Sequence, residues 1–267
     1  MAIYHLSVQI IKRSEGRSAV AAAAYRSGTC LTSEWDGKTY DYIRKEWVEY
    51  SEILLPEYAP QSFKDRQNLW NAVEMAEKSA NAQLAREFEI ALPLELSLEE
   101  QINLAREFVQ KNCVDKGMCA DIAIHNPPVR NGKGRPLDKN GERTNDPNQM
   151  TFQNPHAHVM VTMRPLSVSG KWESKYEKSY LCRRGNEEYS FPASSIGQAE
   201  AEGWRKQYRY YFGKRTIWLT AEAAAKKNLK RVDKQPKIKN IPNSTTANWN
   251  SIEILGTWRK SWEEMCN

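Results

Sequence analysis

Three of the four histidines in this 267-residue chain fall in two short segments with the alternating pattern of β-strands. His156 and His158 are two residues apart, so a strand places both imidazoles on one face, about 7 Å apart. Taken alone, such a pair is more often a structural or surface feature. His125 ends the segment 121–125, however, and if the two strands pair it supplies a third nitrogen. Three neutral imidazoles leave coordination positions open for substrate oxygens, which is typical of a catalytic metal site.

Three carboxylates occupy strand positions that could serve these histidines. Asp121 lies four residues before His125 on the same strand face, where it could accept a ring N–H and orient a metal ligand. Glu87 and Glu89 share a face of another predicted strand, 87–92, and either could orient a histidine or accept a proton. Solvated strand carboxylates are the alternative interpretation, above all for Glu89.

The rest of the chain supplies strands and helices in no regular alternation. Strands are predicted at 3–10, 87–92, 121–125 and 156–163, with a hairpin formed by 39–43 and 47–55. Helices are predicted at 18–28 behind an N-cap serine, at 63–78, at 97–112 behind a capping box, and at 253–266. This order favours an α+β fold, an antiparallel sheet with helices packed mainly on one face.

The basic charge of the chain is concentrated in one segment. The formal net charge is +6, yet residues 205–239 alone contain 12 basic and two acidic residues, while 1–204 are slightly acidic. We therefore expect a main domain over 1–204 and a basic extension over 205–267. Cations alternate with aromatic residues there, which suits single-stranded DNA because bases stack on rings while phosphates pair with charges; an amphipathic helix packed on the main domain is the alternative. The cations are Arg205, Lys206, Arg209, Lys214 and Arg215.

A long segment, 126–153, joins the strands that hold the histidines. It is rich in Gly and Pro and carries Lys133 and Arg135 among its cations. Segments of this length are usually functional or disordered. Because its ends adjoin His125 and His156, we expect it either to close over a bound nucleic acid or to be a solvated, mobile loop.

The composition argues against several classes of protein. No run of roughly 18 apolar residues predicts a membrane span, and the N-terminus lacks the basic-then-apolar pattern of an export signal. The five cysteines are odd in number and never spaced Cys-x-x-Cys, which favours neither a complete disulfide framework nor a cysteine zinc site. A cytoplasmic protein with reduced thiols is the expectation.

Five motifs occur in order along the main domain: Tyr4-His5-Leu6-Ser7; Ser18-Ala19 with an alanine run that leads into Tyr25-Arg26-Ser27; Glu87-Phe88-Glu89-Ile90-Ala91-Leu92-Pro93; Asp121-Ile122-Ala123-Ile124-His125; and Asn154-Pro155-His156-Ala157-His158. Together they resemble the MobA/MobL plasmid-mobilisation relaxases of the HUH endonuclease superfamily. The resemblance covers essentially the whole main domain and implies the antiparallel sheet of HUH proteins.

The resemblance implies strand-specific nicking at a plasmid origin of transfer, which starts conjugative mobilisation. In such relaxases a tyrosine attacks the scissile phosphate and leaves a covalent 5′-phosphotyrosyl adduct and a free 3′-hydroxyl; reversal rejoins the strand. Tyr25 matches the family's nucleophile, and Glu87 matches the first carboxylate of its Arg-Glu motif. His125, His156 and His158 match the metal-binding residues.

The expected ligands follow from the same resemblance. The family implies Mn²⁺ or Mg²⁺, although imidazole donors by themselves suit Zn²⁺, Mn²⁺ or Ni²⁺ better than Mg²⁺. The expected substrate is single-stranded DNA at an origin of transfer, and Arg17 and Arg26 lie near enough to Tyr25 in sequence to contact its phosphates. Accessory relaxosome proteins and coupling proteins are further candidate partners. Because family members often continue into further domains, we expect the chain to be the N-terminal part of a longer protein.

Three other functions stay open at this point. A rolling-circle replication initiator shares the chemistry but generally places its tyrosine after the His-x-His pair, whereas Tyr25 lies far upstream. A non-catalytic DNA-binding module with a structural metal would bind without cleavage. A metal-dependent hydrolase that activates water would cleave without a covalent adduct.

Overall fold

The computed structural model describes residues 5–243 and 246–267, which form two compact units. Unit 1 comprises Met1–Glu173 and Asn248–Asn267, and unit 2 comprises Ser174–Ala247. These bounds differ from the division at 204/205 that the charge distribution favours. The reason is that strands on both sides of residue 204 pair within unit 2, while the C-terminal helix belongs to the core of unit 1.

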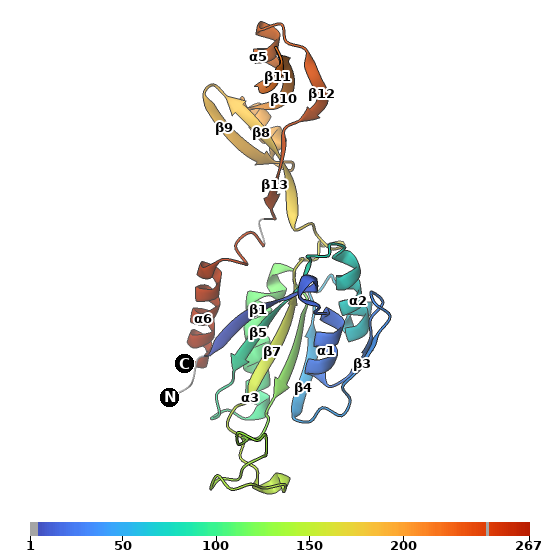
Figure 1. The fold of residues 1–267 in the computed structure, drawn as a ribbon. Coiled ribbons are helices and arrows are strands. Elements are labelled where there is room, and N and C mark those ends of the chain that lie inside the picture. The colour runs from blue at the N-terminus through green and yellow to red at the C-terminus, as the bar shows by residue number, and fades with distance from the viewer. Residues whose placement is uncertain (1–4, 244–245) are drawn as a thin grey trace. The chain divides into compact units, whose positions relative to one another are not determined.

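Unit 1 is built on a five-stranded antiparallel sheet (Figure 1). In spatial order its strands are β1 (Leu6–Lys12), β5 (Gln83–Ala91), β7 (His156–Thr162), β6 (Ala120–His125) and β4 (Val48–Leu54). The three central strands, β5, β7 and β6, overlap the strands predicted at 87–92, 156–163 and 121–125. Residues 3 and 4 of the first predicted strand, with Tyr4 of the first motif, lie outside the described residues.

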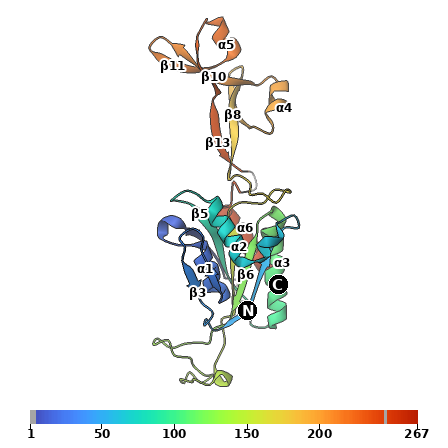
Figure 2. The same cartoon turned by 90° about the vertical axis from the view of Figure 1, so that its right-hand side faces the viewer.

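Helices cover both faces of this sheet, as Figures 1 and 2 show. On one face, α1 (Ala19–Ser27) and α2 (Arg66–Ala76) pack against one cluster of buried apolar residues. On the other face, α3 (Leu98–Asn112) and α6 (Ile252–Cys266) pack against a second cluster. The α+β class is confirmed, but the helices are not confined mainly to one face, because the central strands carry apolar side chains on both sides.

Local sequence signals fix the ends of the helices near the site. Ser18 caps α1 by accepting the backbone N–H of Ala21, and Gly28 ends the helix in the left-handed conformation with φ 64°. Ser97 and Glu100 form the predicted capping box of α3. The predicted helix boundaries are therefore confirmed where a capping side chain marks them.

The hairpin predicted from 39–43 and 47–55 is wrong. β3 (Thr39–Asp41) pairs with β2 (Cys30–Thr32), whereas β4 pairs with β6 at the edge of the main sheet. There Tyr50 and Leu54 of β4 pack against the core beneath α3. β-propensity marked the strands correctly, but burial of an apolar face selects the partner strand.

Unit 2 is a small β-domain with its own core. Its strands are β8 (Tyr176–Arg184), β9 (Glu187–Pro192), β10 (Arg205–Phe212), β11 (Arg215–Thr220), β12 (Arg231–Pro236) and β13 (Ile238–Pro242). The short helices α4 (Ile196–Ala201) and α5 (Ala221–Lys226) complete it. The first part of the basic extension therefore forms strands, not an amphipathic helix. None of the helices in the described part of the chain combines the length and the apolar run that crossing a membrane requires.

Candidate active site

Strand register brings His125, His156 and His158 together; we call them the histidine triad. His125 of β6 pairs with His156 of β7, and Ala123 pairs with His158, so the three imidazoles project from one patch of the sheet. Their ring centroids lie 4.9 to 5.5 Å apart. One nitrogen from each ring lies within 4.8 Å of the others, which is a spacing that can hold one metal ion.

The protein environment keeps two members of the triad ready for metal binding. Burial lowers the pKa of His125 to about 4, although a hydrogen bond to the Arg26 carbonyl opposes the shift, and the nearby Lys45 adds to it. Burial also lowers the pKa of His156. Both imidazoles are therefore neutral at pH 7, which is the state that binds a metal.

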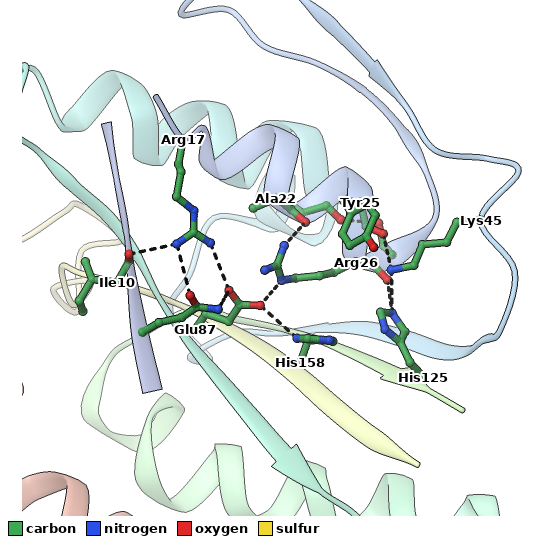
Figure 3. A network of polar contacts seen from close by, with 12 residues as sticks. Ile10, Arg17, Ala22, Tyr25, Arg26, Lys45, Glu87, His125 and His158 are labelled. Atoms are coloured by element: carbon green, nitrogen blue, oxygen red, sulfur yellow. Dashed lines mark hydrogen bonds and ion pairs between the residues drawn. The ribbon is translucent and has the colours of Figure 1, made fainter. Parts of the chain in front are cut away.

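A buried carboxylate, Glu87, orients His158, the third member of the triad (Figure 3). The His158 Nδ1 lies 3.0 Å from the Glu87 Oε1, and the Glu87 side chain is 0% exposed. Burial raises the pKa of this carboxyl, but hydrogen bonds from His158 and Arg26 outweigh it and hold the pKa below its usual value. Because an ionised carboxylate only accepts, Nδ1 carries the hydrogen and Nε2 is left for a metal.

Three other side chains donate to or pair with Glu87. The Arg26 guanidinium contacts Oε1, the Gln9 amide donates to Oε2 over 2.9 Å, and Arg17 lies 3.5 Å from the same oxygen. The carboxylate is thus saturated, and no hydrogen bond joins it to Tyr25 within the described ranges. These contacts support a positioning role for Glu87. They also show that Arg17 and Arg26, expected to bind DNA phosphates, are held by this carboxylate.

Asp121 does not orient a histidine, contrary to expectation. Its two oxygens accept hydrogen bonds from the Arg66 guanidinium at 2.8 and 2.9 Å and from the Trp70 indole at 2.8 Å. The reason is the register, which pairs Asp121 with Met160, beyond His158 on β7. Asp121 therefore anchors α2 to the sheet.

Tyr25 lies in the last turn of α1, immediately above the triad. The buried Ala23 and Ala24 bring this helix close to the sheet, as the alanine run allowed. As a result, the His125 Nε2 lies 2.6 Å from the carbonyl oxygen of Arg26, the residue after the tyrosine. The Tyr25 side chain is 48% exposed, so its hydroxyl remains open to a substrate.

Lys45 completes the site and was not expected. Its ammonium lies 3.8 Å from the centroid of the Tyr25 ring, 2.9 Å from the Tyr25 carbonyl oxygen and 3.5 Å from the His125 Nε2 (Figure 3). Burial, with the nearby Arg26, lowers the pKa of Lys45 to about 8, while Glu87 partly opposes the shift. A lone lysine in a turn carries no sequence signal, and only the fold places it beside the tyrosine.

Comparison with known proteins agrees with this geometry. A sequence profile of the MobA/MobL family matches residues 17–267. The chain belongs to the MobA/MobL family. It is 40% identical over 178 residues to the mobilization protein MobL of Acidithiobacillus ferridurans, covering 64% of this chain and 46% of that protein.

Other relatives are considerably longer than this MobA/MobL chain. It is 40% identical over 177 residues to the conjugal transfer protein TraA of Rhizobium radiobacter, covering 62% of this chain and 14% of that protein. It therefore spans less than half the length of these curated relatives. A solved structure described as "Molecular Basis of Vancomycin Resistance Transfer in Staphylococcus aureus" matches all of this chain and 91% of that one, with 27% identity and a TM-score of 0.60.

The remaining predicted cations of this MobA/MobL chain belong to segment 126–153 and to unit 2. Lys133 and Arg135 lie in segment 126–153, which is folded by short bridges and turns. In unit 2, Arg205 pairs with Glu222 and Lys206 with Glu200, both at the surface. The other three also belong to unit 2: Arg209 pairs with Asp233, and Lys214 and Arg215 lie exposed at the turn between β10 and β11.

Proposed function

We propose that this chain nicks and rejoins one strand of DNA at a plasmid origin of transfer and so starts conjugative mobilisation. The observation that carries the proposal is the contact between the tyrosine-bearing turn of α1 and the histidine triad, through the Arg26 carbonyl and His125. The contact brings an exposed tyrosine close to three imidazoles whose spacing could hold a metal ion. Membership of the MobA/MobL family supports the same conclusion.

In the proposed reaction, the Tyr25 oxygen attacks the scissile phosphorus and the bond to the 3′-oxygen breaks. The product is a 5′-phosphotyrosyl adduct with a free 3′-hydroxyl. A phenol has a pKa of about 10, so its proton must leave as the new bond forms. The half-exposed hydroxyl releases this proton to solvent, and the departing 3′-oxygen takes one up.

The other residues of the site have separate roles in the proposed reaction. The triad would hold a divalent cation, which supplies charge neutralisation at the non-bridging phosphate oxygens. The three-nitrogen donor set suits Mn²⁺ better than Mg²⁺. Glu87 fixes the orientation of His158, and the Lys45 ammonium over the Tyr25 ring favours the phenolate that develops during attack.

Unit 2 is proposed to hold the DNA strand. Cations lie over several of its aromatic rings, such as Arg231 over Tyr208 at 3.7 Å and Lys237 over Trp218 at 5.6 Å. Tyr211 and Phe212 are exposed beside them. Phosphates pairing with these charges and bases stacking on these rings would give binding with little sequence preference.

The decisive experiment uses end-labelled single-stranded DNA from the protein's own transfer origin with Mn²⁺, resolved under denaturing conditions. We expect an adduct on the 5′ side of the break that Tyr25→Phe abolishes. Tyr42→Phe is the matched control, since Tyr42 packs edge-on against Tyr25 at 5.2 Å. Cleavage without an adduct would identify a hydrolase, and binding without cleavage would identify a DNA-binding module.

A further inference from the structure

A pocket of about 330 Å³ opens on unit 1 close to the histidine triad but on the other face of the sheet. Its lining residues include Asn126 and Pro155, which directly adjoin His125 and His156 in the chain. Ile124 also lines it and, by strand alternation, faces away from His125. The volume is at the small end of ligand pockets, which run from roughly 300 to 1,000 Å³.

Six of the nine residues that line the pocket are apolar, and two of them are well exposed. Leu94, Leu96 and Leu98 form one side, and Phe152 and Pro155 lie among the other lining residues. Leu94 is 56% exposed and Leu98 is 39% exposed. A flat aromatic ring bound in the pocket would remove part of this apolar surface from water.

The polar groups of the pocket are mainly acceptors that lack donors. The Asn126 Oδ1 is buried with no hydrogen-bond partner in the described part of the chain. Gln101 uses its side-chain nitrogen on the Pro93 and Leu96 carbonyls, which leaves its side-chain oxygen for another donor. Glu49 adds a carboxylate. The pocket therefore suits a ligand that presents several N–H groups.

An irregular stretch of backbone places Glu49 at this pocket. β4 carries a register shift between Val48 and Tyr50, and Trp47 before it has φ 67°, a strained value for a bulky residue. Trp47 packs its ring 5.4 Å from Phe152 and holds the Asn126 amide through its own carbonyl. Strained backbone of this kind is enriched at active sites and ligand-binding sites.

We propose that this pocket, which reaches the strand ends that carry His125 and His156, binds a guanine base of the nicked strand near the nick. Among the four bases, guanine alone presents adjacent N1–H and N2–H₂ donors on one edge, which match the two oxygens of the Glu49 carboxylate. Adenine and cytosine offer one amino group and thymine one N–H. Stacking on Phe152 would hold the base, as aromatic residues hold splayed single-strand bases.

Only one part of this proposal rests on the proposed function, namely that the guanine belongs to the nicked DNA strand. Binding of the base is therefore tested first, without cleavage. The intact chain in metal-free buffer is titrated with dGMP, dIMP, dAMP, dCMP and dTMP, followed by NMR of the side-chain amides. Inosine lacks only the 2-amino group, so we expect dGMP to bind about tenfold more tightly than dIMP. Glu49→Ala removes the acceptor of both guanine donors, so it should lower dGMP affinity below the dIMP level of the parent chain and abolish the difference between dGMP and dIMP. Glu46→Ala, an exposed neighbour, should change neither.

Equal affinity for dGMP and dIMP, or a guanine preference that survives Glu49→Ala, would overturn the pocket assignment. The nicking assay then locates the base through inosine replacement of each guanine in the origin strand. We expect one position near the nick to raise KM about tenfold at unchanged kcat, and an effect at no position overturns the proposal. An adduct that persists in Tyr25→Phe would instead refute the nucleophile and leave the titration result intact.

Discussion

The histidine site of unit 1 and the basic sheet of unit 2 use charged side chains in opposite ways. In unit 1, the 0% exposed Glu87 is saturated by His158, Arg26, Gln9 and Arg17. In unit 2, pairs such as Arg183 with Glu188 lie at the surface. A buried charge without its partners is costly, whereas a surface pair contributes about 0 to 1 kcal/mol.

This difference indicates that unit 1 is suited to holding a fixed geometry, whereas unit 2 is suited to binding a charged ligand. The saturated network of unit 1 allows one arrangement of His158, which a metal site needs. The exposed cations of unit 2 can exchange their carboxylate partners for phosphates at little cost. We therefore expect changes in unit 1 to alter stability and metal affinity, and changes in unit 2 to alter the strength of DNA binding.

The largest expected effect tests whether the C-terminal helix belongs energetically to unit 1. Trp262 of α6 is fully buried against Phe108, with ring centroids 5.4 Å apart. Trp262→Ala should lower the free energy of unfolding of unit 1 by about 3–5 kcal/mol through loss of apolar contact and a cavity. Hydrogen exchange by mass spectrometry should show faster exchange in unit 1 alone. Trp204→Ala is the counterpart in the core of unit 2, and equal loss of protection in both units for either variant would contradict the division.

A second prediction concerns the stability of unit 1 at acidic pH. All four histidines precede residue 174, so unit 2 has none. The pKa of His125 is about 4 in the folded protein, below the ordinary 6.5, so the unfolded chain binds the extra proton first. Without metal, the stability of unit 1 should fall as the pH drops from about 6.5 to about 4, by at most about 3 kcal/mol. Urea unfolding across this range measures the slope. His125→Gln should flatten it, and an unchanged slope would show that His125 does not titrate as described.

A third prediction addresses the saturated carboxylate directly. Glu87→Gln removes the charge that orients His158, so Mn²⁺ affinity should fall by about 10- to 100-fold, measured by calorimetry. Glu188→Gln changes the same group in an exposed pair of unit 2 and should leave Mn²⁺ affinity unaltered. If both variants bind Mn²⁺ like the parent chain, the network does not tune the triad.

Local signals predicted a large part of this architecture. Strand alternation placed His156 and His158 on one face, and side-chain caps marked α1 and α3. The choice of Tyr25 depended on resemblance to relaxases, because nothing local separates it from the other tyrosines. Its placement beside His125 then follows from close packing of alanines on the sheet.

Features that depend on distant partners could not be predicted. Glu87 and Asp121 look equivalent as strand carboxylates, and only the register decides that Glu87 meets a histidine while Asp121 meets Arg66. Lys45 lies in a turn whose position depends on β4 joining β6 instead of β3. The return of α6 to unit 1 likewise depends on a core to which distant segments contribute.

The smallest expected effect tests whether unit 2 carries the electrostatic part of DNA binding. Deleting 205–267 would remove α6 from the core of unit 1, so charge removal at the surface is the cleaner change. Lys214→Gln with Arg215→Gln, at the exposed turn between β10 and β11, should reduce the slope of log affinity against log salt by about 1.4 if each residue contacts one phosphate of a single strand. Lys111→Gln with Lys260→Gln removes the same charge from α3 and α6 and should leave the slope unchanged. An equal reduction in both double variants would mean that net charge, and not the surface of unit 2, attracts the DNA.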